Sequence, residues 1–143
     1  MLNFVLKFKT MKMKNSKVLK GTLLYLGGNL IVIGSWRLFD PISFALVNDM
    51  DLNGQVSLIN EARGAAGAIV GFGILIVLGV FIKRLTYTSS IMGPVLYLGY
   101  GVARLLSCII DGYPGEMAMV GMIGEFVVGS IGLFALMKYS EEK

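Results

Sequence analysis

The sequence predicts an all-α membrane protein, a bundle of four transmembrane helices, and three observations point to this class. Of the 143 residues, 55% are hydrophobic and 15% are charged, whereas a soluble domain has about 25% charged residues. The mean hydropathy is +0.74. The apolar residues form four blocks, each close to the ~20 residues that cross a bilayer as a helix.

The four blocks predict the boundaries of the helices. They cover residues 21–39, 62–82, 91–110 and 117–137. A strand of a membrane barrel needs only ~10 alternating residues, so these blocks are too long for strands. Helices also satisfy their own backbone hydrogen bonds within lipid. We therefore expect one transmembrane domain over residues 21–138, with an external loop over residues 40–61.

The placement of charge predicts the orientation. Basic residues precede the first helix, separate the second from the third and follow the fourth: Lys7, Lys9, Lys12, Lys14, Lys17, Lys20, Lys83, Arg84, Lys138 and Lys143. The opposite ends carry Asp40, Asp49, Asp51, Glu61, Asp111 and Glu116. Basic loops stay in the cytoplasm, so we expect both termini there, with the basic segment 1–20 facing anionic lipid. Nucleic acid is not an expected partner, because the lysines adjoin a membrane span and no aromatic platform accompanies them.

The amino terminus leaves alternatives open. A basic region before an apolar block is typical of a signal peptide, but this block is nearly of spanning length and no A-x-A-like site follows it. We therefore expect the segment to be retained. Met11 has the context of a natural start, which would make residues 1–10 an extension. The alternative is a short interfacial helix with Phe4 and Phe8 among the lipid headgroups.

The external loop contains signals of its own. Pro41 favours the first turn of a helix, so "PISFALV" is expected to form a short helix in the outer interface. Ser57 or Asn60 is expected to cap the second long helix, which places Glu61 in its first turn. A calcium loop is a second interpretation of "DMDLNG", but position twelve of that loop is Asn60, and Glu61 comes one residue late.

Several chemistries are disfavoured. The chain has no histidine, which removes haem ligation by His and most zinc or di-iron sites. Its single cysteine, Cys108, cannot form an internal disulfide and is expected to act as a small buried hydrophobe. No nucleotide-binding or hydrolase motif occurs. We name no catalytic residue, cofactor or metal, and a role without catalysis is favoured.

Glycines mark the faces where we expect helices to pack. Of the 19 glycines, six recur at spacings of three, four or eight along two of the helices, and small residues let membrane helices approach closely. We expect tight packing at these positions rather than a ligand groove. They are Gly64, Gly67, Gly71, Gly121, Gly129 and Gly132.

A polar stripe follows the third helix. Tyr97, Tyr100, Arg104, Ser107 and Asp111 recur at helical spacing. If the hairpin turns near residue 113, Arg104 lies about 13 Å along its helix, and a carboxylate on the fourth helix lies about 18 Å along its own. That carboxylate is residue 125.

Charge inside a bilayer needs a partner. An unpaired charge near the bilayer centre costs at least ~2.5–3.5 kcal/mol, so such residues face inward and pair. We infer an ion pair between Arg104 and Glu125, or a network that Tyr97, Tyr100 and Asn29 join. Its outer end would be closed by Arg37, Asn60, Glu61 and Arg63.

At these residues the chain resembles a bacterial membrane family catalogued as domain of unknown function 4345 (DUF4345). The resembling segments are "NEARGAAG" at residues 60–67, "GVARLLSCIIDGYPGE" at residues 101–116, and Glu125. The resemblance covers roughly residues 23–137. It implies a four-helix protein of the bacterial inner (plasma) membrane and marks Asn60, Glu61, Arg63, Arg104, Ser107, Asp111 and Glu125. It implies no substrate or reaction.

Two functions are compatible with this pattern. The leading interpretation is a small multi-pass membrane protein that acts as a binding or accessory module, with an outward-facing polar pocket around Arg104 and Glu125. The alternative is a small proton-coupled exporter in which Glu125 exchanges a proton for a cationic or lipophilic substrate. An enzyme acting on a lipid or quinone is disfavoured by the missing histidines. The expected partners are the lipid bilayer and either a second copy of the chain or another membrane protein.

Overall fold

The structure, a computed structural model, describes residues 11–142. The strands are β1 (Met11–Met13) and β2 (Ser140–Glu142). Between them lie the helices α2 (Lys17–Phe39), α3 (Pro41–Val47), α4 (Val56–Phe81), α5 (Lys83–Ile110) and α6 (Glu116–Tyr139). All of these helices except α3 are long and apolar enough to cross a membrane. The predicted all-α class with four spans is confirmed, while the interfacial helix considered for residues 1–10 falls outside the described residues.

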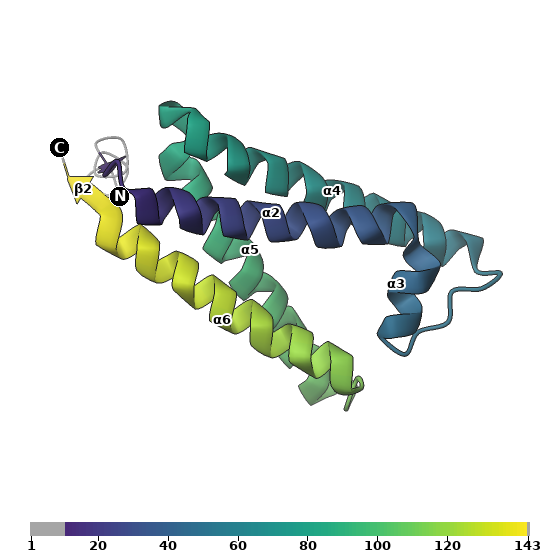
Figure 1. Cartoon of the computed structure of the whole chain (residues 1–143). Coiled ribbons are helices and arrows are strands. Elements are labelled where there is room, and N and C mark those ends of the chain that lie inside the picture. The colour runs from purple at the N-terminus through teal and green to yellow at the C-terminus, as the bar shows by residue number, and fades with distance from the viewer. Residues whose placement is uncertain (1–10, 143) are drawn as a thin grey trace, which may run out of the picture.

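The helices form a wedge. Helix α2 lies beside α4, and α5 lies beside α6; the two ends of the chain meet at one end of the molecule and α3 lies at the other (Figure 1). Helices α2 and α6 are close near the chain ends and diverge toward α3 (Figure 1). The core fills the closed part of the wedge with Leu19, Leu23, Leu26, Leu30, Ile76, Tyr97, Val128 and Ala135.

The closest approach of helix backbones is between α2 and α4. A Cβ atom placed on Gly27 would lie 2.7 Å from the carbonyl oxygen of Gly73, and one placed on Gly73 would lie 2.8 Å from that of Gly27. Neither helix can carry a side chain here, so this glycine pair determines how closely α2 and α4 pack. The side chain of Leu26, the residue before Gly27, would lie 3.1 Å from a Cβ atom on Gly132 of α6.

Two of the six glycines expected to pack lie against another helix, and both are in α6. Gly129 packs against Leu98 and Gly132 against Leu26 and Pro94. A Cβ atom at any of the other four predicted positions would meet nothing within 4 Å, so the packing expected there is not present within the chain: Gly64, Gly67, Gly71 and Gly121. The first three face outward from α4. The expectation of a second copy or a membrane partner stays a prediction.

Three helices begin earlier than the apolar blocks predict. Helix α2 begins at Lys17, α4 at Val56 and α5 at Lys83, whereas the blocks begin at residues 21, 62 and 91. Hydropathy marks only the apolar part of a helix, and a helical backbone continues into polar residues because its hydrogen bonds are internal. The predicted loop 40–61 is correspondingly shortened by α3 and by the first turns of α4.

The predicted cap of α4 is wrong, whereas the short helix predicted over "PISFALV" is present as α3. Gln55 is the N-cap of α4 and makes no side-chain cap bond, so Ser57, Asn60 and Glu61 all lie inside the helix. Pro41 is in the first turn of α3, and the amide of Ser43 donates to Asp40 Oδ1 at 3.1 Å. Asp40 ends α2 as well.

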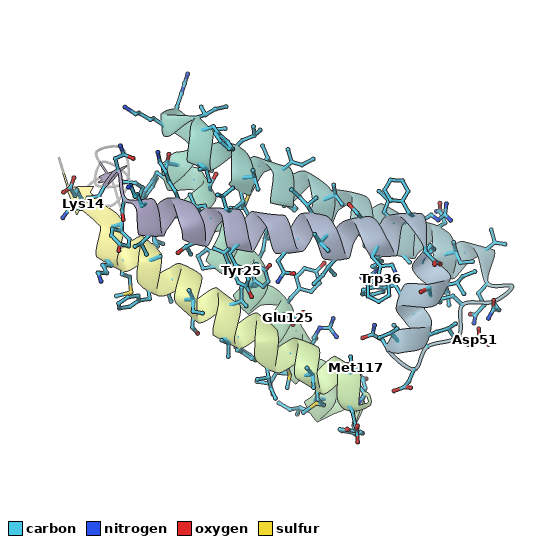
Figure 2. The ribbon with its side chains drawn as sticks, in the orientation of Figure 1. Lys14, Tyr25, Trp36, Asp51, Met117 and Glu125 are labelled. Atoms are coloured by element: carbon cyan, nitrogen blue, oxygen red, sulfur yellow. The ribbon has the colours of Figure 1, made fainter. Side chains whose placement is uncertain are left out.

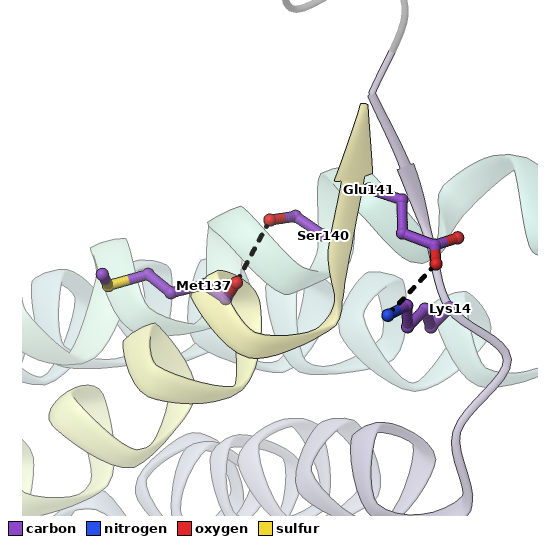
Figure 3. Close-up of polar contacts among 4 residues, drawn as sticks. All are labelled: Lys14, Met137, Ser140 and Glu141. Atoms are coloured by element: carbon purple, nitrogen blue, oxygen red, sulfur yellow. Dashed lines mark hydrogen bonds and ion pairs between the residues drawn. The ribbon is translucent and has the colours of Figure 1, made fainter. Parts of the chain in front are cut away.

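The chain ends are joined by a feature that the sequence analysis missed. Strands β1 and β2 pair antiparallel. Close to them, Lys14 Nζ lies 3.2 Å from Glu141 Oε1, and Ser140 Oγ donates to the Met137 carbonyl at 3.3 Å (Figure 3). Ser16 then caps α2 by accepting from the amide of Val18 at 3.2 Å. Three-residue strands carry too little periodicity to be recognised in a sequence.

Candidate functional site

A cavity of about 400 Å³ occupies the open part of the wedge. It is lined by residues of α2, α3, α5 and α6, together with Asn48 and Ile69. Its volume is within the range of small-molecule sites. Tyr25 on α2 and Glu125 on α6 lie on facing sides of the space between these helices (Figure 2). Five aromatic side chains line it: Tyr25, Trp36, Phe44, Tyr97 and Tyr100.

The predicted pair of Arg104 and Glu125 is present in the wall of this cavity. Arg104 Nε donates to Glu125 Oε1 at 3.0 Å, which joins α5 to α6. The carboxylate side chain is 17% exposed and the guanidinium side chain 37%. A charge-assisted bond of this length is among the stronger hydrogen bonds, so the pair holds the two helices together inside the apolar region.

Both partners keep unused hydrogen-bonding capacity. Glu125 Oε2 is buried and has no hydrogen-bond partner among the described residues. Arg104 has five N–H donors, and Nε alone is used among the described residues. Arg37 also lines the cavity, with its guanidinium 5.8 Å from the centre of the Phe44 ring and no acceptor in the described chain. The cavity wall therefore offers more donors than the protein itself satisfies.

Aromatic contacts shape the end of the cavity at α3. The rings of Trp36 and Phe44 pack edge to face with centroids 5.4 Å apart. Asn48 ends α3 and donates from Nδ2 to the Phe44 carbonyl at 2.9 Å, which fixes the last turn of that short helix. Helix α3 thereby places Phe44 between Trp36 and Arg37, so its sequence forms one boundary of the cavity.

Tyr97, which lines the cavity, makes its hydrogen bond to α2. The hydroxyl of Tyr97 donates to the Leu26 carbonyl at 3.0 Å, so it joins α5 to α2 rather than joining the charged pair. The expected role of Tyr97 in the ionic network is therefore corrected. Tyr100 and Asn29 do line the cavity, but no hydrogen bond connects them to Arg104 or Glu125 among the residues described.

Other predicted site residues lie outside the cavity. Ser107 Oγ donates to Asp111 Oδ2 at 2.8 Å at the exposed end of α5. Asn60, Glu61 and Arg63 are exposed on α4 and do not line the cavity, so the expectation that they close its outer end is wrong. All three lie in the first three turns of α4 with exposed side chains.

The turn considered for calcium is held by its own side chains. Asn53 donates to Asp51 Oδ1 from its amide at 2.9 Å and from Nδ2 at 2.7 Å. Within residues 11–142, no group of three His, Cys, Asp or Glu side chains has the arrangement of a metal site. Cys108 is half-buried, with its Sγ 3.7 Å from Met119 Sδ.

A second cavity, of about 760 Å³, lies at the end where the chain termini meet. Four of the predicted basic residues line it: Lys14, Lys20, Lys83 and Arg84. The turn between α4 and α5 and the start of α2 thus share one end of the molecule. Asp40 and Asp111, at the ends of α2 and α5, and Asp51, in the loop between α3 and α4, lie at the other end. The segregation of charge that the sequence predicts is present in the fold.

Sequence analysis missed the aromatic wall on α2. Tyr25, Asn29, Ile33 and Trp36 follow at spacings of four, four and three residues, so they share one face of the helix and all line the cavity. This spacing is the signal that would have found them. It was not recognised because aromatic residues on a membrane helix are also typical of lipid-facing surfaces.

The fold and this cavity define a class of protein: a small helical chain with four potential membrane spans and a charged pair beside an aromatic-lined cavity. The chain matches the family model described as "Domain of unknown function (DUF4345)" over residues 18–136. It belongs to that family, as its polar motifs indicate. No curated protein and no solved structure matches the chain.

Proposed function

We propose that this protein is a multi-pass protein of the bacterial inner membrane that binds a lipophilic molecule in the cavity beside Arg104 and Glu125. The single observation that carries the proposal is the cavity itself, about 400 Å³ between diverging helices. A close-packed bundle would have closed this space, since membrane helices gain stability mainly from packing. Aromatic and apolar walls with few polar groups are typical of small-molecule sites.

The proposed orientation places the cavity in the outer half of the membrane. The chain termini and the basic turn share one end, and basic segments are retained in the cytoplasm. The end with α3 then faces outward. Single-cysteine labelling in a Cys108→Ser background tests this arrangement: an impermeant maleimide applied to intact cells should modify Asn53→Cys and spare Tyr139→Cys. Labelling of Tyr139→Cys from outside would reverse the orientation.

The binding proposal is tested by filling the cavity. Gly124 lines the cavity, and a Cβ atom there would meet nothing within 4 Å, so Gly124→Leu should fill space without displacing a helix. Gly99→Leu is the matched control, because Gly99 is an exposed glycine of α5 with the same open surroundings and does not line the cavity.

Native mass spectrometry supplies the measurement. Purified parent, Gly124→Leu and Gly99→Leu proteins are equilibrated with a total lipid extract of the expression host. We expect the parent and Gly99→Leu to retain a lipid-sized adduct that Gly124→Leu loses. Equal adducts on all the proteins would show that the cavity binds no lipid-extractable molecule, and the proposal would then fail.

One observation favours the proton-coupled exporter as a second candidate. Glu125 Oε2 is buried without a partner in the described chain, and an unpaired carboxylate oxygen inside a membrane protein is a position where a proton can bind. Glu125→Gln keeps the shape of the side chain and removes this capacity. In liposomes loaded with a pH-sensitive dye, the exporter reading requires a proton flux in the parent that Glu125→Gln abolishes; equal rates would exclude it.

A further inference from the structure

We propose that the molecule bound in this cavity is a single-chain anionic amphiphile, with a carboxylate or phosphate head held by Arg37 and Arg104. The proposal rests on the binding function proposed above and specifies its ligand class. It follows from the charges and donors in the cavity wall, from the volume, and from the way the walls are arranged around the opening between α2 and α6.

The charge of the wall is the first argument. Among the charged residues that line the cavity, Arg37 and Arg104 are positive and Glu125 is negative. Glu125 neutralises Arg104 at 3.0 Å, whereas Arg37 has no carboxylate partner in the described chain. The cavity therefore has an excess of one positive charge, and a head with a single negative charge would balance it.

The geometry of the donors is the second argument. The guanidinium of Arg37 lies 5.8 Å from the centroid of the Phe44 ring, and its N–H groups have no hydrogen-bond acceptor in the described part of the chain. Arg104 uses Nε for Glu125 and leaves its terminal nitrogens unused. Guanidinium groups match the oxygens of carboxylates and phosphates, which accept two parallel hydrogen bonds. Neutral heads present fewer and weaker acceptors.

The walls and the volume determine the rest of the ligand. Apart from its charged residues, the cavity is lined largely by apolar groups, including Leu30, Ile33 and Val128. Helices α2 and α6 border it on facing sides (Figure 2). An acyl chain fits these surfaces because burying apolar area contributes roughly 25 cal/mol per Å². A volume of about 400 Å³ suits one chain, and two chains would extend into the surrounding lipid.

The proposal is tested through Trp36, the single tryptophan of the chain, which lines the cavity. Bromine quenches tryptophan fluorescence at short range. Because Trp36 is 44% exposed, probe in the surrounding micelle also quenches it, so binding in the cavity is measured as the quenching that Gly124→Leu removes and Gly99→Leu keeps. The probes share a dibromostearoyl chain and differ in the head: the fatty acid, its lysophosphatidylglycerol, its monoacylglycerol and its choline ester. Each is titrated into the purified protein in detergent, at a mildly alkaline pH at which the fatty acid is ionised.

We expect both anionic probes to half-quench Trp36 at about tenfold lower concentration than the neutral monoacylglycerol, a difference of about 1.4 kcal/mol. Arg37→Gln should abolish this preference, and Arg37→Lys should keep most of it. The matched control is Arg63→Gln, which removes one positive charge at the same end of the molecule from an exposed position outside the cavity. It should leave the preference unchanged.

The outcomes separate this inference from the proposed function. Equal quenching by the anionic and the neutral probes in the parent would overturn the head assignment. So would a loss of the preference for anionic probes in Arg63→Gln equal to that in Arg37→Gln. If Gly124→Leu lowers quenching by all probes, the cavity is a binding site whatever its head preference. If every probe quenches Trp36 in Gly124→Leu and Gly99→Leu as strongly as in the parent, the cavity binds none of the probes and both proposals fail. A preference for the fatty acid over the phosphate probe, or the reverse, identifies the head.

Discussion

The close approach of α2 and α4 at Gly27 and Gly73 gives the sharpest prediction of stability. Gly73→Ala would place a methyl carbon 2.8 Å from the carbonyl oxygen of Gly27, and ordinary contact begins near 3.4 Å. The helices would have to separate by roughly 0.6 Å at this point, because the obstructing atom belongs to the backbone and cannot rotate away. Overpacking of this kind costs about 1–3 kcal/mol.

Gly71→Ala is the matched control two residues away on the same helix. A Cβ atom at Gly71 meets nothing within 4 Å, so the substitution gains up to about 1 kcal/mol from helix propensity. The same gain applies at Gly73, and the net cost there is therefore about 0–2 kcal/mol. The two variants should differ by about 1–3 kcal/mol, since the propensity gain is common to both and only the overpacking remains.

The assay is unfolding in mixed micelles of increasing dodecyl sulfate content, followed by the loss of helical circular dichroism. Gly73→Ala should unfold at a lower dodecyl sulfate fraction than the parent, and Gly71→Ala at the same or a higher fraction. The sequence pattern alone predicts the opposite order, because it assigns Gly71 to the packing face. A greater loss of stability in Gly71→Ala than in Gly73→Ala would therefore refute the packing of α2 on α4 described above.

Two further predictions concern the charged pair and the turn before α6. Arg104→Ala should destabilise the protein more than the double change Arg104→Ala with Glu125→Ala, because removing one partner leaves the other charge buried and unpaired. Removing one partner of a fully buried pair costs ~3–5 kcal/mol of stability. The partial exposure of Arg104 makes the expected cost smaller here. Additive losses in the same unfolding assay would show that the two residues are not coupled. Gly112→Ala and Gly115→Ala should each cost about 1–3 kcal/mol, since their φ angles are +100° and +99°, whereas the helical Gly121→Ala should be neutral or stabilising. A neutral Gly115→Ala would contradict the turn geometry.

The sequence predicts the spans well because each depends on a local property. An apolar block of about 20 residues is recognisable without knowledge of its neighbours, and all four such blocks lie in helices. The pair of Arg104 and Glu125 was predictable for a similar reason, because two lone charges in adjacent apolar helices have few other partners. The first residue of each helix was less predictable, since helices α2 and α5 begin at polar residues, Lys17 and Lys83, that precede the apolar blocks.

The extent of the cavity and the contact between Gly27 and Gly73 could not be predicted, because they depend on how the helices are placed. Gly71 and Gly73 both lie in α4, and only the crossing of α2 decides that Gly73 is the packed one. The aromatic wall on α2 is recognisable as a face, but it becomes a cavity wall only because α2 and α6 diverge toward α3 (Figure 1). Tyr97 likewise has a partner on α2 that no spacing within α5 indicates.

The position of the ion pair bears on the choice between a brace and a binding site. Arg104 and Glu125 join α5 to α6, so the pair lies within one wall of the cavity and does not cross its opening between α2 and α6. A ligand can therefore enter along α2 without separating the two charges, and a structural brace and a ligand site coexist in one arrangement. Proton-coupled export differs, because Glu125 loses its charge each time it takes up a proton. Its ion pair with Arg104, at 3.0 Å, is then broken in every cycle. Leaving Arg104 unpaired beside an apolar wall costs free energy at every cycle, unless an anionic ligand replaces the carboxylate. An exporter built on this pair would thus require an anionic substrate, which is the ligand class that Arg37 also favours.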